Sequence, residues 1–166
     1  MNILPLKGID KLQFGTYKSD ILKSLGKPDS IENLDAKDEV SSEIYYYDSM
    51  GLGLYFDKDT GFRLWGLSIT DPAIQLNGVF PIGMSETDLL KAFPAIVLHV
   101  RAGEFTEYLS PAHALAFYLN ANVLHSALLR PHLAEYIVQY SRHHHNLCLH
   151  IRAFLLTISL ASLLYS

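Results

Sequence analysis

The stretch FGTYKSDILKSLGKP, residues 14–28, decides the interpretation of the fold, because it contains a short helix with both ends marked. Apolar side chains recur in it at helical spacing and predict one apolar face, at positions 17, 21, 22 and 25. Thr16 is the better N-cap by residue type, with Tyr17 as the alternative start. Gly26 is expected to end the helix, and Pro28 prevents its continuation.

A weaker copy of this stretch, IGMSETDLLKAFP, occupies residues 82–94. Ser85 followed three residues later by Asp88 resembles a capping box, which predicts the start of a second helix. Phe93 would close the apolar face of this helix, and Pro94 would stop it.

Similar strand patterns follow both helices. After the first helix come a polar connector at 29–43, a strand at 44–48 and a hairpin that turns at DKDTG and returns over 64–69. After the second helix come EFTEYLS, an alternating stretch at 115–119, a turn at 120–122 and a returning strand at 123–129. We therefore expect an α+β fold of two tandem repeats, each a short helix followed by an antiparallel β-meander. The expected boundaries are 1–72, 73–129 and an atypical apolar C-terminal segment at 130–166.

The C-terminal segment differs in composition from the rest of the chain. The last lysine is Lys91, and Glu135 is the only acidic residue after Glu107. The apolar run at 153–165 is shorter than the about 20 residues that a membrane-spanning helix needs. Three interpretations stay open: a helix that packs on the fold, an out-of-frame or otherwise non-native extension, and association with a membrane.

Charge and cysteine content exclude several classes of protein. The net charge of −4 disfavours a general nucleic-acid binder, which would be basic. The single cysteine, Cys148, rules out an internal disulfide and a multi-cysteine zinc site. The N-terminus has no long apolar segment typical of a secretory signal, so a cytoplasmic location is expected.

No catalytic signature is present in the sequence. G-x-S-x-G is absent, and GLGLYF at 51–56 lacks the third glycine of a phosphate-binding loop. The run His143, His144 and His145 invites a metal site, but three consecutive side chains of a helix cannot converge on one ion. We expect a protein that is not an enzyme and needs no cofactor. A small enzyme remains the alternative, with a site at the junction of the repeats formed from Asp71, His99 and Glu104.

The acidic connector at 29–43 and the strand after it form the candidate binding surface. The connector contains six acidic residues against one lysine, and three consecutive tyrosines follow it. Tyr45 and Tyr47 share one face of a strand, and they would point outward if the face with Tyr46 packs on the helix. The residues expected to bind a partner are Asp35, Asp38, Glu39, Glu43, Tyr45, Tyr47, Tyr55, Asp57, Asp59 and Trp65. Acidic rims speed encounter with basic partners, and aromatic side chains anchor interfaces. The alternative is a solvated loop that leads into a half-buried strand.

Residues 8–129 resemble a family of small bacterial tandem-repeat proteins, many of which are immunity proteins encoded beside toxins. FGTYKSDILKSLGKPDS, IYYYDSMGLGLYFD, FRLWGLSI and IGMSETDLLKAF carry this resemblance. The arrangement is also similar to β-lactamase inhibitor proteins and, in its helix signature, to small outer-membrane assembly lipoproteins. The chain departs from the lipoproteins in lacking a signal peptide and a lipobox cysteine.

The resemblance implies a non-catalytic binding module, an immunity-type inhibitor that blocks a basic bacterial toxin sterically and electrostatically. An uncharacterised structural or adaptor protein without a toxin partner is the alternative. The sequence leaves the partner's identity and the oligomeric state open.

Overall fold

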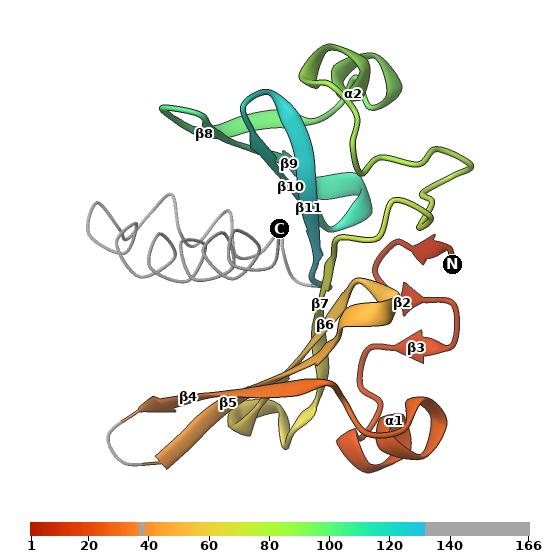
Figure 1. The fold of residues 1–166 in the computed structure, drawn as a ribbon, viewed down its shortest axis with the longest axis vertical. Helices are drawn as coiled ribbons and strands as arrows, with labels where there is room; N and C mark the ends of the chain where they lie inside the picture. Colours follow the sequence, from red (N-terminus) through yellow and green to blue (C-terminus); the bar gives the residue numbers. More distant parts are fainter. Residues whose placement is uncertain (37–38, 132–166) are drawn as a thin grey trace. The chain divides into compact units, whose positions relative to one another are not determined.

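The structure is a computed structural model that describes residues 1–36 and 39–131 (Figure 1). Residues Met1–Leu133 form one compact unit. The C-terminal segment at 132–166, with its three interpretations, lies outside the described residues. Among the described residues, neither helix has the length and apolar character that spanning a bilayer requires.

One antiparallel sheet of eight strands dominates the fold, in the order β4-β5-β6-β7-β11-β10-β9-β8. Its strands are β4 (Ser30–Ala36), β5 (Glu39–Tyr47), β6 (Leu52–Asp57), β7 (Arg63–Ile69), β8 (Val97–Ala102), β9 (Phe105–Ser110), β10 (Leu115–Asn120) and β11 (Val123–Leu129). Each half of the sheet consists of four consecutive strands. The halves join where β7 pairs with β11, at Leu67 with Leu129 and Ile69 with Ala127.

A second, smaller sheet forms from the first residues of the chain. It contains β1 (Ile3–Leu4), β2 (Gly8–Ile9) and β3 (Leu12–Gln13). The backbone N–H of Ile3 donates to the carbonyl of Gln75 at 2.8 Å, which ties this sheet to the segment between the halves of the large sheet.

The first helix, α1 (Lys18–Leu25), ends at Gly26 with a positive φ of 83°, as the sequence predicts. Its N-cap is Tyr17, and the prediction of Thr16 is wrong. The Thr16 carbonyl instead accepts a hydrogen bond from the backbone of Leu64, so Thr16 is held beside β7 before the helix begins.

The second helix, α2 (Glu86–Ala92), starts at the predicted capping box. The hydroxyl of Ser85 accepts the backbone N–H of Asp88 at 3.2 Å. Phe93 follows as the C-cap, and its ring lies tilted against the ring of Phe117 of β10, with the ring centres 5.5 Å apart.

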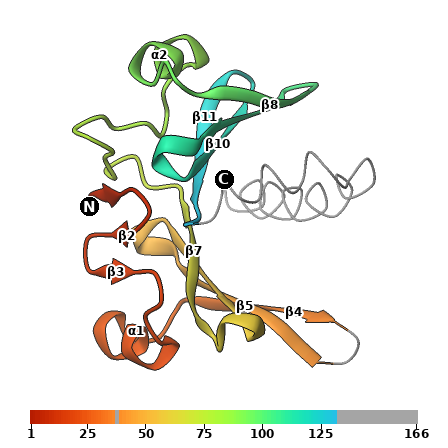
Figure 2. The same cartoon turned by 180° about the vertical axis from the view of Figure 1, so that it is seen from behind.

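Both helices and β1–β3 lie on one side of the large sheet, which we call the helix face (Figures 1 and 2). Residues that are opposite each other on neighbouring strands share a face. The run of partners from β5 to β10 on the helix face is Tyr47, Leu52, Ile69, Ala127 and Phe117, all of them buried. Ile21 of α1 and Leu89 of α2 are buried as well. The main core therefore lies between the helices and this face.

The predicted α+β fold of two helix-plus-meander repeats is wrong. The described chain is mostly β, and its two helices span eight and seven residues. Within the predicted polar connector at 29–43, Ser30–Ala36 form β4 and residues 39–43 belong to β5, and the stretch after α2 forms β8. The pairing of β7 with β11 merges the strands into one continuous sheet instead of two separate meanders.

The predicted hairpins are confirmed. The strands β6 and β7 join through η2 (Lys58–Thr60), a short 3-10 turn that ends at Gly61 with φ of 65°. The strands β10 and β11 join at Ala121 and Asn122, both with positive φ.

Candidate protein-binding surface

Strand pairing brings acidic residues from two stretches of the sequence to one end of the sheet. The β5–β6 register sets Ser42 opposite Asp57, beside the hairpin between β4 and β5. We call this region the acidic hairpin end, defined by Asp35, Glu39, Asp57 and Asp59. Asp35 and Glu39 are placed by their backbone in β4 and β5. The predicted Asp38 lies outside the described residues.

Within the acidic hairpin end, the two aspartates of the η2 turn differ in role. One carboxylate oxygen of Asp57 accepts the backbone N–H of Asp59 at 3.0 Å and caps η2. The other accepts the hydroxyl of Ser42 at 3.4 Å. Asp57 therefore shapes the turn, whereas Asp59 is exposed at its tip and is the better placed of the two to meet a partner.

Glu43 lies on the helix face and is committed to a contact within the chain. Its two carboxylate oxygens accept hydrogen bonds from Nζ of Lys18 at 2.8 and 2.9 Å. Lys18 is in the first turn of α1. Burial acts to lower the pKa of Lys18, but Glu43 and Tyr45 together outweigh it and leave that pKa raised. This ion pair fastens α1 to the sheet, so Glu43 contributes little to a free acidic surface.

The expectation that Tyr45 and Tyr47 point outward is wrong. Tyr45 is 5 % exposed and packs edge-on against Phe56, with ring centres 5.0 Å apart. Tyr47 is 3 % exposed, and its hydroxyl donates to the carbonyl of Gly26 at 3.0 Å. Burial is the main reason that the pKa of each tyrosine is raised. The odd-numbered face of this strand packs under α1, so these two rings are core.

The opposite side of the sheet, which we call the second face, carries Tyr46, Tyr55 and Trp65. Tyr46 is half-buried, and its hydroxyl donates to Glu32 of β4 at 2.7 Å. Burial, followed by this hydrogen bond, raises its pKa strongly. Tyr55 packs edge-on against Trp65 at 5.8 Å, and burial raises the pKa of Tyr55. Of the predicted aromatic residues, Tyr55 and Trp65 are therefore on this face, but Tyr55 is 4 % exposed and offers no surface to a partner.

Trp65 lies beside Tyr55 on the second face. It is the extra residue where the β6–β7 register shifts, and its ring is half-buried. The Arg130 guanidinium lies 4.8 Å from its ring centre. The indole N–H is buried and makes no hydrogen bond to the described residues. An unsatisfied donor of this kind costs free energy, and its burial keeps it from an external acceptor.

The predicted position of Tyr46 on the helix face is wrong, although the sequence contains a signal for the second face. Tyr46 is opposite Gly53 on β6, and a Cβ built on that glycine would lie 3.4 Å from the tyrosine ring and 2.3 Å from Ser68 Oγ. A glycine that faces an aromatic residue across a pair of strands indicates a ring lying over the bare backbone.

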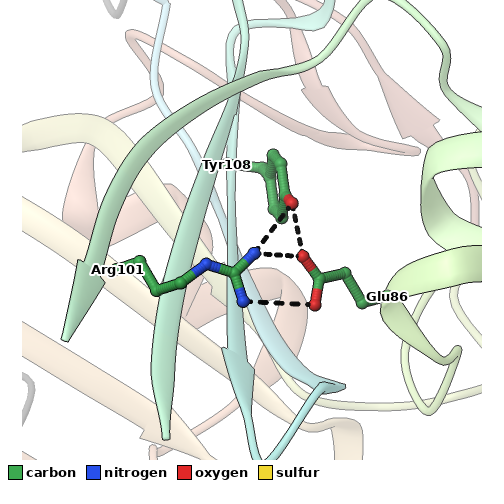
Figure 3. A network of polar contacts seen from close by, with 3 residues as sticks. All are labelled: Glu86, Arg101 and Tyr108. Atoms are coloured by element: carbon green, nitrogen blue, oxygen red, sulfur yellow. Dashed lines mark hydrogen bonds and ion pairs between the residues drawn. The ribbon is translucent and has the colours of Figure 1, made fainter. Parts of the chain in front are cut away.

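A further polar cluster, which the sequence did not reveal, joins α2 to the sheet (Figure 3). The carboxylate of Glu86, in the first turn of α2, accepts hydrogen bonds from the guanidinium of Arg101 on β8 and from the hydroxyl of Tyr108 on β9. Arg101, followed by Tyr108, lowers the pKa of Glu86, and the bond to Glu86 raises the pKa of Tyr108. These three groups satisfy one another, so the cluster serves as a structural link between α2 and two strands.

The alternative enzyme site is not assembled. Asp71 follows β7 and lies beside Gly51, whereas His99 is on β8, with β11, β10 and β9 between. His99 Nδ1 instead lies 3.0 Å from a carboxylate oxygen of Glu107. Glu104 is in the turn between β8 and β9.

The sequence predicts incidental metal binding at most. Within residues 1–36 and 39–131, no three histidine, cysteine or acidic side chains gather in a way that could hold an ion. The His143–His145 run lies outside the described residues.

Comparison with known proteins leaves the family open. No family model matches the chain, and no curated protein matches it significantly. Among solved structures, an extracellular protein containing an SCP domain from Bacillus anthracis str. Ames matches with a TM-score of 0.48 and 12 % sequence identity. The match covers 75 % of this chain and 48 % of that chain, so this chain spans about half of its length. Similarity at this level carries no argument about function.

Proposed function

We propose that this chain is a non-catalytic protein-binding module, an immunity-type inhibitor that occupies the surface of a basic toxin. The observation that supports it is the proximity of two features in the same half of the sheet. The acidic hairpin end supplies negative charge, and the second face supplies Tyr46 and Trp65. Acidic side chains attract a basic surface over a distance, and half-buried aromatic side chains hold it once it arrives.

The contact surface differs from the one first expected. Tyr45, Tyr47 and Glu43 are removed from it, because they pack under α1. Tyr55 is removed as well, because it is 4 % exposed. Tyr46 joins the surface, and Trp65, Asp57 and Asp59 stay. Trp65 is half-buried, so part of its ring remains open to a partner.

Affinity capture with matched variants tests the proposal. The full-length chain is used as bait beside Trp65→Phe, which replaces the half-buried indole by a smaller ring, and beside Asp59→Lys, which reverses an exposed charge. Lys11→Glu, at an exposed position before α1, is the matched control. We expect the wild type and the control to retain a basic protein that both surface variants retain poorly.

The captured protein is then expressed in cells with and without this chain. If this chain is an inhibitor, the wild type restores growth. The double variant with Asp59→Lys and Trp65→Phe does not. Capture of a non-toxic protein would favour the adaptor alternative. Equal rescue by both forms would contradict the proposed contact surface.

A further inference from the structure

The strand β8 is an edge of the large sheet, and its side chains are unusually exposed. Five of its six residues, Val97–Ala102, are exposed and the sixth is half-buried. Val97 is 59 % exposed and Leu98 is 48 % exposed. Successive side chains of a strand point to opposite faces, so apolar surface is present on both sides of this edge.

The backbone of β8 has one side that no described strand occupies. Among the described strands it pairs only with β9, as the last strand in the order of the sheet. Every second residue of an edge strand directs its N–H and C=O groups away from the sheet, where they can pair with another strand. Natural edge strands are commonly protected by charge, and the sequence of β8 contains only His99 and Arg101 as basic residues and no acid.

Those two basic side chains are already engaged with acids inside the chain. Arg101 pairs with Glu86 on α2, and His99 pairs with Glu107 on β9. Two β8 strands brought together would therefore not oppose uncompensated like charges. The opposite edge differs, because β4 contains Glu32 and Asp35, and two copies of β4 would oppose acids.

We propose that β8 is a self-association surface, on which the β8 strand of a second copy of this chain pairs in antiparallel orientation. A two-fold axis through the pair uses the same strand from both copies, so the assembly closes as a dimer. Val97 and Leu98 of each copy would then be covered on opposite faces of the joined sheet. The register shift between Leu98 and Val100 keeps the new ladder short, so the dimer is weak and concentration-dependent. This inference does not depend on the proposed function.

A matched pair of lysine variants tests the surface in the full-length chain. Leu98 on β8 and Ile31 on β4 are 48 % and 47 % exposed, and each is opposite a tyrosine on its neighbouring strand. Sedimentation equilibrium is measured between about 1 μM and about 1 mM, the range in which small interfaces dissociate. We expect Leu98→Lys to raise the dimer dissociation constant by about tenfold or more, and Ile31→Lys to leave it within about twofold.

A chain that stays monomeric over this range would overturn the proposal, as would a dimer that both lysine variants weaken equally. Cysteine scanning supplies a second readout. Val97, Leu98, His99 and Val100 are replaced by cysteine one at a time in a Cys148→Ser background. A symmetric antiparallel pair predicts efficient disulfide crosslinking at the position nearest the two-fold axis and little at the others. Equal or absent crosslinking at all four positions would contradict β8 pairing.

Discussion

At the scale of single residues, Gly51 is the position where backbone conformation and packing combine. It ends η1 (Asp48–Met50) with φ of 56°, and a Cβ there would lie 2.5 Å from the backbone nitrogen of Asp71. Gly61 has a similar φ of 65°, but a Cβ at that position would meet no atom of the described residues within 4 Å. A comparison of alanine substitutions at the two glycines therefore separates the cost of a left-handed backbone from the cost of a steric clash.

We expect Gly61→Ala to lower the free energy of unfolding by about 1–2 kcal/mol, the cost of a left-handed alanine. Gly51→Ala adds a collision with backbone and is expected to cost about 3 kcal/mol or more. Urea unfolding of both variants measures this difference. Equal losses would show that the contact between Gly51 and Asp71 does not constrain the turn.

The Glu86 carboxylate gives a residue-scale prediction about pH. Its pKa is lowered in the folded state, chiefly by Arg101, so the ionised form stabilises the fold. That stabilisation is complete above the ordinary pKa of glutamate and is lost as the pH falls through the lower folded-state pKa. We expect the stability advantage of the wild type over Glu86→Gln to shrink in the same acid range, as measured by urea unfolding at a series of pH values.

The same comparison in an Arg101→Gln background serves as the control for Glu86. Without the guanidinium, the advantage over Glu86→Gln should vary less with pH. An advantage that is independent of pH in the wild-type background would contradict the assigned ion pair.

At the scale of secondary-structure elements, the two helices begin differently. Ser85 caps α2 through its hydroxyl, whereas Tyr17 makes no side-chain cap for α1. We expect Ser85→Ala to lower the free energy of unfolding by about 1 kcal/mol. Ser19→Ala, at an exposed position inside α1, is the control and should change stability by less than about 0.5 kcal/mol. Similar effects of both variants would contradict a specific capping role for Ser85.

Local signals predicted some of these elements and missed others. Gly26 and the capping box marked helix ends, and DKDTG marked the turn between β6 and β7, because these features depend on neighbouring residues. The strand β4 was missed because edge strands carry polar residues on both faces and lose the alternating pattern. The strand β8 was missed although it is apolar, since its short run follows directly after a helix stop.

The faces of β5 were predicted incorrectly for a related reason. Positions 44–47 read Ile-Tyr-Tyr-Tyr, so both faces of the strand carry large apolar or aromatic groups. Period-2 alternation cannot choose the buried face of such a stretch. The choice is made by tertiary contacts, in which Tyr47 reaches the end of α1 and Lys18 reaches Glu43.

At the scale of the whole molecule, the join between β7 and β11 makes one sheet from two groups of strands. Sequence patterns do not determine such a join, because its partners, Leu67 and Leu129, are far apart in the chain. The compact unit Met1–Leu133 contains every described strand of both sheets. We therefore expect the chain truncated after Leu133 to unfold in one cooperative transition, as monitored by circular dichroism during urea titration. Two separate transitions, or the loss of cooperativity, would contradict this.

The charge of the whole molecule gives a prediction about the rate of association with a basic partner. Up to Glu107 the chain contains 16 acidic residues, and the acidic hairpin end concentrates several of them. Association with a basic partner should therefore slow as ionic strength rises from about 0.01 M to about 0.5 M, because screening shortens the reach of the attraction. Stopped-flow measurement of the association rate checks this, and a rate that does not depend on salt would remove the electrostatic part of the proposal.

The proposed partner-binding surface consists of the acidic hairpin end and the second face. Hydrogen–deuterium exchange of the full-length chain, with and without the captured partner, tests it most directly. We expect slower exchange in the partner's presence over β5, β6, η2 and β7, with little change in α1 and α2. Protection centred on the two helices, or none in the β5–β7 region, would contradict it.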